Sequence, residues 1–420
     1  MIETTLVELT LNITDGKHGD CQGENNSGYY FISCKDVKDG VINYGEARQI
    51  TEKDFLEVHK RTLLEPNDIL LTNSGTIGRM AFVKDTPKTY KTTFQKSVAI
   101  IKPNPNKILP QYLYYLLQYC VDDFINQSNG SAQKNLLLST MRSFKMKYHT
   151  NDDIQNKIVG ILSAYDKLIE NNQKQIKLLE EAAQRLYKEW FVDLRFPGHE
   201  NTKIVDGVPE GWKKISLGEI IGFEIGGGWG EEQPTEKCDQ PAYVIRGTDI
   251  HDVTHGNAKS IPYRYHAQSN LASRILQDGD IVFEVSGGSK NEGVARTALI
   301  TQSLIDFINE NIICASFCKL IRVKDRRLSK YIYDLFQYLR KSGETVKYDK
   351  RSASSIVNYR WKDFLEQQMI FVPTEDVLNG YNAVAEHIQK SIVNKAKIIE
   401  QAKEARDRLL PKLMSGELEV

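Results

Sequence analysis

The sequence predicts an α+β protein that contains two copies of one unit, each made of a mixed α/β domain followed by a long helix. Three observations lead to this prediction. Similar segments recur about 220 residues apart in the same order, and strand-like runs bounded by turn residues alternate with helical runs in each copy. Each copy then ends in a long helical pattern that no glycine or proline interrupts over most of its length.

The internal repeat rests on three pairs of matched segments. Their order is the same in both halves of the chain, and chance similarity would not preserve it. The pairs are 112–119 (YLYYLLQY) with 331–338 (YIYDLFQY), 68–83 with 280–289 followed by 293–300, and 181–186 (EAAQRL) with 404–409 (EARDRL). The chain therefore carries two copies of one folding unit.

Each mixed domain contains short runs of β-type composition between glycine, proline and asparagine residues, which is typical of strands and turns. We expect strands at 69–72, 80–83 and 97–101 in the first copy and at 281–285, 295–300 and 317–323 in the second. Helices are expected at 112–126 and 330–342. The predicted domains are 1–150 and 198–373, with helical segments at 151–197 and 374–420.

The two long helices carry apolar residues at steps of three and four along one face. About 40 residues with a rise of 1.5 Å form a rod of roughly 60 Å, and its apolar stripe must be covered. An antiparallel coiled coil around a pseudo-two-fold axis would cover both stripes, whereas the alternative packs each stripe on its own domain. Polar residues interrupt both stripes, at Asn171-Asn172 and Asn394-Lys395, and they either fix the pairing register or are simply solvent-exposed.

The composition is that of a globular protein. The chain has 420 residues, of which 40% are hydrophobic and 26% charged, and this excludes wholesale disorder. Lys plus Arg and Asp plus Glu both total 55, so net charge neither favours nor excludes a nucleic-acid partner. Six scattered cysteines without a CxxC pair favour free thiols and a cytoplasmic location. Neither a signal peptide nor a membrane span is expected, because no long apolar run occurs.

Basic residues are concentrated in the mixed domains although the whole chain is neutral. Segment 128–149 has four basic residues and no acid, segment 84–107 has six against one, and segment 340–362 has seven against two. Interleaved Asn, Gln, Ser and Tyr suit contacts with phosphates and base edges, although an ordinary solvated surface is the alternative for any one run. Two similar domains at opposite ends of paired helices would read two separated half-sites, and DNA is the natural ligand of that geometry.

Three glycine-rich turns, at 73–78, 226–230 and 287–290, would let the backbone approach a ligand closely, although each also fits an ordinary tight hairpin. In these turns and in the basic segments, we predict that Lys and Arg mostly grip phosphates and that Asn, Ser and some Arg read base edges. The predicted DNA-contacting residues are Asn73, Ser74, Thr76, Arg79, Lys96, Lys134, Asn135, Arg142, Trp229, Ser289, Lys290, Asn291, Arg296, Lys347, Lys350 and Arg351.

Common catalytic patterns are missing from the sequence. It has no GxxxxGK[ST] loop, no GxGxxG in a βαβ setting and no NPP[FY] or DPP[FY] tetrapeptide. His251 and His255 lack the Glu of HExxH, so no metal site is expected, and Cys314 and Cys318 are expected in the core. The chain is therefore predicted to be a non-catalytic reader. Two alternatives stay open: an enzyme that modifies or cleaves DNA through an unrecognised active site, and a coiled-coil scaffold with no DNA role.

Several blocks of the sequence carry a family resemblance. The most specific are 161–176 (ILSAYDKLIENNQKQI), 182–193 (AAQRLYKEWFVD), 208–220 (VPEGWKKISLGEI) and 405–418 (ARDRLLPKLMSGEL), with further similarity at 73–83, 97–104 and 130–135. Over essentially its whole length the chain resembles the DNA specificity (S) subunit of type I restriction–modification systems. It departs from the pattern in two places: the first domain lacks the PEGW opening, and the second has 286–293 (SGGSKNEG) where the first has a GTIG turn.

The resemblance implies two target-recognition domains, each of which reads one half of a bipartite DNA site. It implies that the two helical regions form an antiparallel spacer and dock modification (M) subunits, expected to be two. With M subunits the family forms an adenine methyltransferase that uses S-adenosylmethionine, and with restriction (R) subunits an ATP-dependent endonuclease. The resemblance thus places S-adenosylmethionine, ATP and Mg²⁺ on partner subunits and no cofactor on this chain.

Overall fold

The computed structural model describes residues 1–128, 135–287, 293–351 and 356–420. The chain forms two compact units. Unit 1 consists of Met1–Lys167 with Ala402–Val420, and unit 2 consists of Leu168–Gln401. Each unit therefore contains one mixed α/β domain together with part of both long helices.

The centre of unit 1 is a four-stranded antiparallel sheet with the order β2-β10-β7-β8, and a second sheet, β6-β3-β9, pairs β3 with β9 in parallel. Two further antiparallel pairs, β1 with β11 and β4 with β5, complete the strands found in the described residues. The strands are β1 (Ile2–Thr5), β2 (Thr10–Asp15), β3 (Tyr30–Ile32), β4 (Val37–Lys38), β5 (Val41–Ile42), β6 (Arg48–Gln49), β7 (Ile69–Thr72), β8 (Met80–Phe82), β9 (Thr92–Phe94), β10 (Val98–Pro103) and β11 (Lys145–Tyr148). The helices are α1 (Glu52–Thr62), α2 (Pro110–Tyr119), α3 (Val121–Asn126) and α4 (Leu138–Ser143), with 3-10 turns η1 (Leu6–Leu9), η2 (Cys34–Asp36) and η3 (Thr89–Lys91).

Unit 2 has a four-stranded antiparallel sheet, β15-β22-β18-β20, and a three-stranded sheet, β17-β16-β21, in which β16 and β21 are parallel. It also contains the antiparallel sheet β19-β24-β23 and the pairs β14 with β25 and β12 with β13. The strands are β12 (Ile204–Val205), β13 (Val208–Pro209), β14 (Lys213–Ser216), β15 (Ile221–Gly226), β16 (Gln240–Ile245), β17 (Tyr263–His266), β18 (Ile281–Glu284), β19 (Ser286–Gly287), β20 (Thr297–Leu299), β21 (Ile312–Cys314), β22 (Cys318–Val323), β23 (Asp349–Arg351), β24 (Val357–Tyr359) and β25 (Met369–Val372). The helices are α6 (Leu217–Ile220), α7 (Ile250–Thr254), α8 (Gln268–Ala272), α9 (Gln302–Ile308), α10 (Ser329–Lys341) and α11 (Trp361–Gln367), with 3-10 turns η5 (His199–Asn201), η6 (Gly247–Asp249), η7 (Arg326–Leu328) and η8 (Glu344–Tyr348).

The two mixed domains share one topology, which is the internal repeat seen in the sequence. The sheet β2-β10-β7-β8 has the same strand order as β15-β22-β18-β20. An equivalent ion pair links the two central strands in each copy, from Lys102 to Asp68 at 2.8 Å in unit 1 and from Arg322 to Asp280 at 2.7 Å in unit 2. In both pairs the aspartate is buried and directly precedes a central strand, so the two ion pairs occupy matching positions, as an internal repeat requires.

A glycine recurs where the first strand of each sheet ends. A Cβ on Gly16 would lie 1.9 Å from the Phe94 carbonyl oxygen, and a Cβ on Gly227 would lie 2.1 Å from the Cys314 carbonyl oxygen. No side chain fits at such a separation, so only glycine allows the chain to pass here. In both copies the next residue donates its N–H to the same carbonyl, at 2.8 and 2.9 Å.

The predicted strands and helices mostly agree with the structure, with one clear exception. Strand β7 has the predicted bounds, and the other five predicted strands correspond to β8, β10, β18, β20 and β22. The single helix expected at 112–126 was wrong, because Cys120 leaves helical geometry (φ −87°, ψ 7°) and separates α2 from α3. The break lets Val121 on α3 press against Gly78, where a Cβ would lie 2.7 Å from the Val121 Cγ2.

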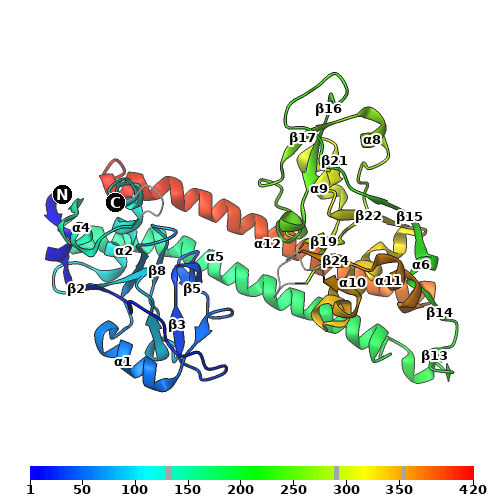
Figure 1. Cartoon of the computed structure of the whole chain (residues 1–420), viewed down its shortest axis with the longest axis horizontal. Coiled ribbons are helices and arrows are strands. Elements are labelled where there is room, and N and C mark those ends of the chain that lie inside the picture. Colours follow the sequence, from blue (N-terminus) through cyan, green and yellow to red (C-terminus); the bar gives the residue numbers. More distant parts are fainter. Residues whose placement is uncertain (129–134, 288–292, 352–355) are drawn as a thin grey trace. The chain divides into compact units, whose positions relative to one another are not determined.

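The two longest helices are α5 (Asp152–Tyr187), which continues into a π-helical turn at Lys188–Val192, and α12 (Glu375–Ser415), as Figure 1 shows. In unit 1, Asp166 of α5 pairs with Arg406 of α12 at 2.8 Å, and Ile158 shares a buried cluster with Leu413. Along these contacts the residue numbers of α5 fall as those of α12 rise, so the two segments run antiparallel within this unit.

The segments of α5 and α12 in unit 2 also run antiparallel. Lys395 donates a hydrogen bond to the side chain of Gln175, and Trp190 lies against Gly380, whose Cβ would be 3.7 Å from the indole. Within each unit the long helices make contacts of both kinds that were considered for the apolar stripes. The helices contact each other, and their ends also join the cores of the mixed domains, through Ile158 in unit 1 and Phe191 in unit 2.

The polar interruptions of the stripes differ from each other in what they do. Asn172 is buried, and its side-chain N–H donates to the Leu168 carbonyl of its own helix at 2.8 Å. Lys395, in contrast, reaches across to Gln175. The contact that could fix a register is therefore Lys395 with Gln175 rather than Asn171-Asn172. No helix among the described residues is both long enough and apolar enough to cross a membrane.

Candidate nucleic-acid interface

The glycine-rich turn at 73–78 forms the hairpin between β7 and β8. Thr72 donates its N–H to the Arg79 carbonyl at 2.8 Å, and Gly78 donates to the Thr72 carbonyl at 3.0 Å. The Thr72 hydroxyl donates to the Thr76 carbonyl at 2.5 Å, which closes the turn from inside. Gly75 (φ 78°) and Gly78 (φ 93°) both occupy the left-handed region that favours glycine, so the composition of the turn follows from its backbone.

Several predicted contact residues gather around this hairpin at one end of the sheet. Ser74 forms a β-bridge with Asn135, and Asn73 donates its N–H to the Ser97 carbonyl, next to the exposed Lys96. Thr76 is exposed at the tip. This end of unit 1 therefore presents hydroxyl, amide and ammonium groups together, which is the mixture that contacts with phosphates and base edges require.

The remaining residues predicted for unit 1 have different surroundings. Asn73 is 4% exposed, and its side-chain oxygen has no hydrogen-bond partner in the described structure, so its amide does not lie on the open surface. Arg79 is half-buried at the base of the hairpin. Arg142 donates to the Ile13 carbonyl at 2.5 Å, beside the middle of β10 rather than at the hairpin. Lys134 lies outside the described residues.

Unit 2 repeats the hairpin between β18 and β20. Glu284 donates its N–H to the Arg296 carbonyl at 2.9 Å, and Ala295 (φ 70°) donates to the Glu284 carbonyl at 3.0 Å, as Gly78 does in unit 1. The predicted contacts Ser289, Lys290 and Asn291 lie outside the described residues.

The sheet β19-β24-β23 joins this hairpin to the basic segment of unit 2. Ser286 pairs with Asn358, which pairs with Lys350, and Gly287 is linked through Val357 to Arg351. Lys350 is exposed, as is Lys347, whereas the Arg351 guanidinium lies 3.9 Å from the Asp349 carboxylate. Arg296 is held in an ion pair with Glu284 at 2.6 Å.

A basic groove, not predicted from the sequence, adjoins this segment. It has a volume of about 570 Å³ and is lined by four cations, two carboxylates and one indole: Lys319, Lys350, Arg360, Lys362, Glu224, Asp363 and Trp361. The Lys319 ammonium lies 5.6 Å from the centre of the Trp361 ring, and the indole N–H donates to Glu224. The sequence signal for this groove was the tryptophan flanked by Arg360 and Lys362. Lys319 could not be predicted to lie there, because it comes from strand β22, far away in the sequence.

Trp229 is 40% exposed, and the Arg264 guanidinium stacks on its ring at 4.7 Å from the centroid. Unit 1 has a similar combination that the sequence prediction missed, in which Lys88 lies 5.3 Å from the Tyr30 ring and 5.0 Å from the Tyr44 ring. Aromatic rings beside cations suit nucleobase stacking and phosphate attraction. The signal in the sequence was the lysine-rich segment 84–107 together with the abundance of tyrosine.

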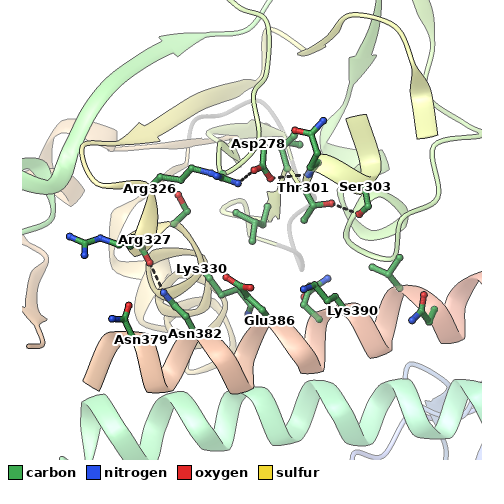
Figure 2. Close-up of a pocket in the computed structure, with 18 residues that line it drawn as sticks. Asp278, Thr301, Ser303, Arg326, Arg327, Lys330, Asn379, Asn382, Glu386 and Lys390 are labelled. Atoms are coloured by element: carbon green, nitrogen blue, oxygen red, sulfur yellow. Dashed lines mark hydrogen bonds and ion pairs between the residues drawn. The ribbon is translucent and has the colours of Figure 1, made fainter. Parts of the chain in front are cut away.

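Another cavity lies elsewhere in unit 2. It has a volume of about 900 Å³ and lies between the mixed domain and α12, where Figure 2 shows Asp278 and Arg326 opposite Asn382 and Glu386. Its polar groups are largely engaged with one another: Arg326 pairs with Asp278, and Asn382 donates to the Arg327 carbonyl at 2.7 Å. None of the predicted DNA contacts that the structure describes is among its lining residues.

The cysteines and histidines considered for catalysis or metal binding are buried or held in hydrogen bonds within the fold. Burial raises the pKa of the Cys314 thiol to about 12, so it stays protonated, and Cys318 is also buried. His255 contacts Glu180 through Nε2 at 3.1 Å and the His251 carbonyl through Nδ1 at 2.7 Å, which occupies both ring nitrogens. Within the described ranges, no group of three or more His, Cys, Asp or Glu residues could hold a metal ion.

Comparisons with known proteins point to one family. Residues 19–181 match the family described as the type I restriction modification DNA specificity domain. The type I restriction enzyme MjaIX specificity subunit of Methanocaldococcus jannaschii is 28% identical over 396 residues, which cover 90% of this chain and 83% of that protein. The HindI specificity subunit of Haemophilus influenzae is 30% identical over 169 residues, covering 39% of this chain and 35% of that one.

A solved structure shares the fold over nearly the whole chain. The crystal structure of the type I restriction–modification S subunit from M. genitalium superposes with a TM-score of 0.55 at 15% identity and covers 98% of this chain and 96% of that one. Together with the sequence relatives, which are named as specificity subunits, this confirms the family predicted from the sequence. The chain is therefore similar to the type I restriction–modification DNA specificity subunits, in residues 19–181 by the family match and over most of its length by relatives named as specificity subunits.

Proposed function

We propose that this specificity subunit reads a bipartite DNA site, with the mixed domain of unit 1 on one half and that of unit 2 on the other. The observation that carries the proposal is the repeated hairpin between β7 and β8 in unit 1 and between β18 and β20 in unit 2, whose base has the same backbone hydrogen bonds in both copies. In each copy the hairpin adjoins exposed basic residues, Lys96 in one and Lys350 in the other. Similar readers with different side chains would recognise two different half-sites.

The two target-recognition domains would correspond to 1–150 and 198–373, and the helical segments to 151–197 and 374–420. The antiparallel contacts of α5 with α12 within each unit support a paired-helix spacer that sets the distance between half-sites. In this proposal the same helices dock two modification subunits, to which restriction subunits are added. S-adenosylmethionine, ATP and Mg²⁺ would belong to those partners, and the complex would work in the cytoplasm.

The exposed lysines are assigned to the DNA backbone and the hydroxyl and amide groups to base edges. Lys96, Lys347 and Lys350 are exposed, so each can reach a phosphate without giving up a buried partner. Removing one phosphate contact should weaken binding to all sequences alike and reduce the slope of log affinity against log salt by about 0.9. Ser74, Thr76 and Asn135 would instead affect a single base position.

Binding to a randomised duplex library tests the proposal. The chain, purified with its modification subunit, should select a motif of two specified halves separated by a fixed unspecified gap. Selection of one contiguous motif, or no selection at all, would contradict it. The two alternative functions give other outcomes: turnover of DNA by the chain alone would favour the enzyme, and absence of salt-dependent binding would favour the scaffold.

A further inference from the structure

The two copies of the hairpin end in an arginine at equivalent positions. Thr72 donates its N–H to the Arg79 carbonyl, and Glu284 donates to the Arg296 carbonyl, at 2.8 and 2.9 Å. The residue before each arginine, Gly78 or Ala295, has a positive φ and donates back to the same strand-end residue. The hairpins therefore match residue for residue at their base, and they differ in the strand-end side chain, threonine in one copy and glutamate in the other.

In unit 2 the strand-end glutamate holds the arginine. Glu284 is 2% exposed, and its two carboxylate oxygens accept from Arg296 Nε at 2.8 Å and Nη2 at 2.6 Å. This bidentate geometry is the strongest that a guanidinium and a carboxylate form, and a buried carboxylate cannot be left unpaired without a large penalty. Arg296 is thereby engaged inside the domain.

The turn η6 makes room for this ion pair. A Cβ on Gly247 would lie 2.3 Å from Glu284 Oε1 and 3.4 Å from Arg296 Nη2, so the pair occupies the space that a side chain would need. The equivalent turn of unit 1 is η2, because Asp36 and Asp249 cap the two turns in the same way, accepting from the N–H of Ser33 and Arg246. Cys34 then stands at the position of Gly247.

In the described part of unit 1, no buried carboxylate holds the arginine as Glu284 does in unit 2. Thr72 is fully buried, and its hydroxyl already bonds with the Thr76 carbonyl and the Arg79 N–H. The Cys34 sulfur lies 3.2 Å from where a Cβ on Gly75 would be, so this side chain packs on the hairpin. Among the residues that the structure describes, no carboxylate or carbonyl accepts a hydrogen bond from the Arg79 guanidinium.

We propose that the strand-end residue decides whether the hairpin arginine is available to DNA, so that Arg79 reads a base in the first half-site and Arg296 holds the second domain together. This rests on the proposed function and assigns a specificity-determining residue within it. The hairpin that ends in Arg79 also carries Ser74, which bridges to Asn135, and an available guanidinium on it suits the bidentate contact that arginine makes with the O6 and N7 acceptors of guanine. The inference therefore predicts a guanine in the half-site that unit 1 reads.

The test uses the full chain in complex with its modification subunit and duplexes that carry each single base change in both half-sites. Arg79→Ala should lose discrimination at one base pair of the first half-site by roughly 5- to 150-fold, with the second half-site unaffected. Arg296→Ala should instead lower the midpoint of thermal unfolding and relax no single base pair. An Arg79→Ala variant that weakens all sequences equally, or changes nothing, overturns the inference.

A grafted ion pair provides the converse test. The double variant Thr72→Glu, Cys34→Gly supplies the carboxylate and the space that unit 2 has, and it should reproduce the Arg79→Ala defect although Arg79 is still present. The matched control Thr72→Gln, Cys34→Gly lacks the charge and should keep discrimination within about 3-fold, well below the 5-fold lower limit expected for losing a bidentate base contact. Equal discrimination by the two double variants would overturn the inference. A wild-type complex that shows no preference for a bipartite site would overturn the proposed function itself, which separates the two failures.

Discussion

Breaking a buried ion pair in unit 2 by removing one partner should strongly destabilise that unit, although the intact pair adds little net stability compared with apolar side chains. Lys330 and Asp334, one turn apart on α10, are 5% and 6% exposed, and the ammonium lies 2.6 Å from both carboxylate oxygens. The Tyr381 hydroxyl of α12 donates to the same carboxylate at 2.6 Å. Burial raises the pKa of Tyr381 well above its ordinary value, so the phenol remains a donor.

Asp334→Leu removes the carboxylate and leaves the Lys330 cation buried without a partner. Removing one member of a buried pair costs about 3–5 kcal/mol, because the remaining charge is desolvated and uncompensated. Replacing both charges with apolar residues of similar volume removes that penalty. The double variant Lys330→Met, Asp334→Leu should therefore recover much of the loss, and the remaining cost should be about 1–3 kcal/mol because the buried Tyr381 hydroxyl loses its acceptor.

Urea unfolding followed by tryptophan fluorescence measures this directly. The four tryptophans of the chain, at 190, 212, 229 and 361, all belong to unit 2, so the signal reports on the unit that is altered. A single variant that loses less than about 1 kcal/mol, or a double variant as unstable as the single one, would refute the reasoning about the buried pair.

Three further predictions concern other parts of the fold. Gly227→Ala should destabilise unit 2 by about 1–3 kcal/mol in the same unfolding assay, because its Cβ would meet the Cys314 carbonyl oxygen. The control Gly226→Ala should stay close to the wild type, because its Cβ would meet nothing within 4 Å. Equal effects of the two variants would contradict this explanation. Burial raises the pKa of Asp68 to about 6 despite its pairing with Lys102, so between about pH 4 and 6 the folded state binds more protons than the unfolded chain. The free energy of unfolding of unit 1 should therefore fall by up to about 3 kcal/mol as pH rises through that window. Asp68→Asn should flatten this dependence in a series of chemical unfolding measurements at different pH. Tyr115→Phe removes a 2.5 Å hydrogen bond from a fully buried phenol to Asp166 and should cost about 1.5–3 kcal/mol, checked by amide hydrogen exchange at the α2 and α5 amides; unchanged protection would argue against it.

The sequence contained enough to predict the repeated architecture. Hydrophobic periodicity and the absence of helix breakers located α5 and α12, and turn residues located the hairpin strands, because these signals are local. The break at Cys120 was missed, because no glycine or proline marks it. It arises from packing of α3 against Gly78, which lies more than 40 residues earlier in the chain.

The candidate contacts were predictable in part, and the limit has a physical cause. Their clustering around two hairpins followed from the repeat, but availability depends on tertiary partners that one sequence does not display. Arg79 and Arg296 lie at equivalent positions, and only the structure shows that the Arg296 guanidinium is hydrogen-bonded to Glu284. In the same way, Asn73 lies in a polar turn and is nevertheless buried, because Ser97 and Leu136 form hydrogen bonds with its backbone.

Mapping DNA methylation in a host that expresses this chain with its modification subunit would show whether two similar domains on one chain each read half of a divided site. We expect every chain-dependent methylation to fall within one motif of two specified halves with a fixed gap, and we expect Arg79→Ala to relax one position in one half. Methylation of a single uninterrupted motif, or a variant that alters both halves, would contradict these expectations.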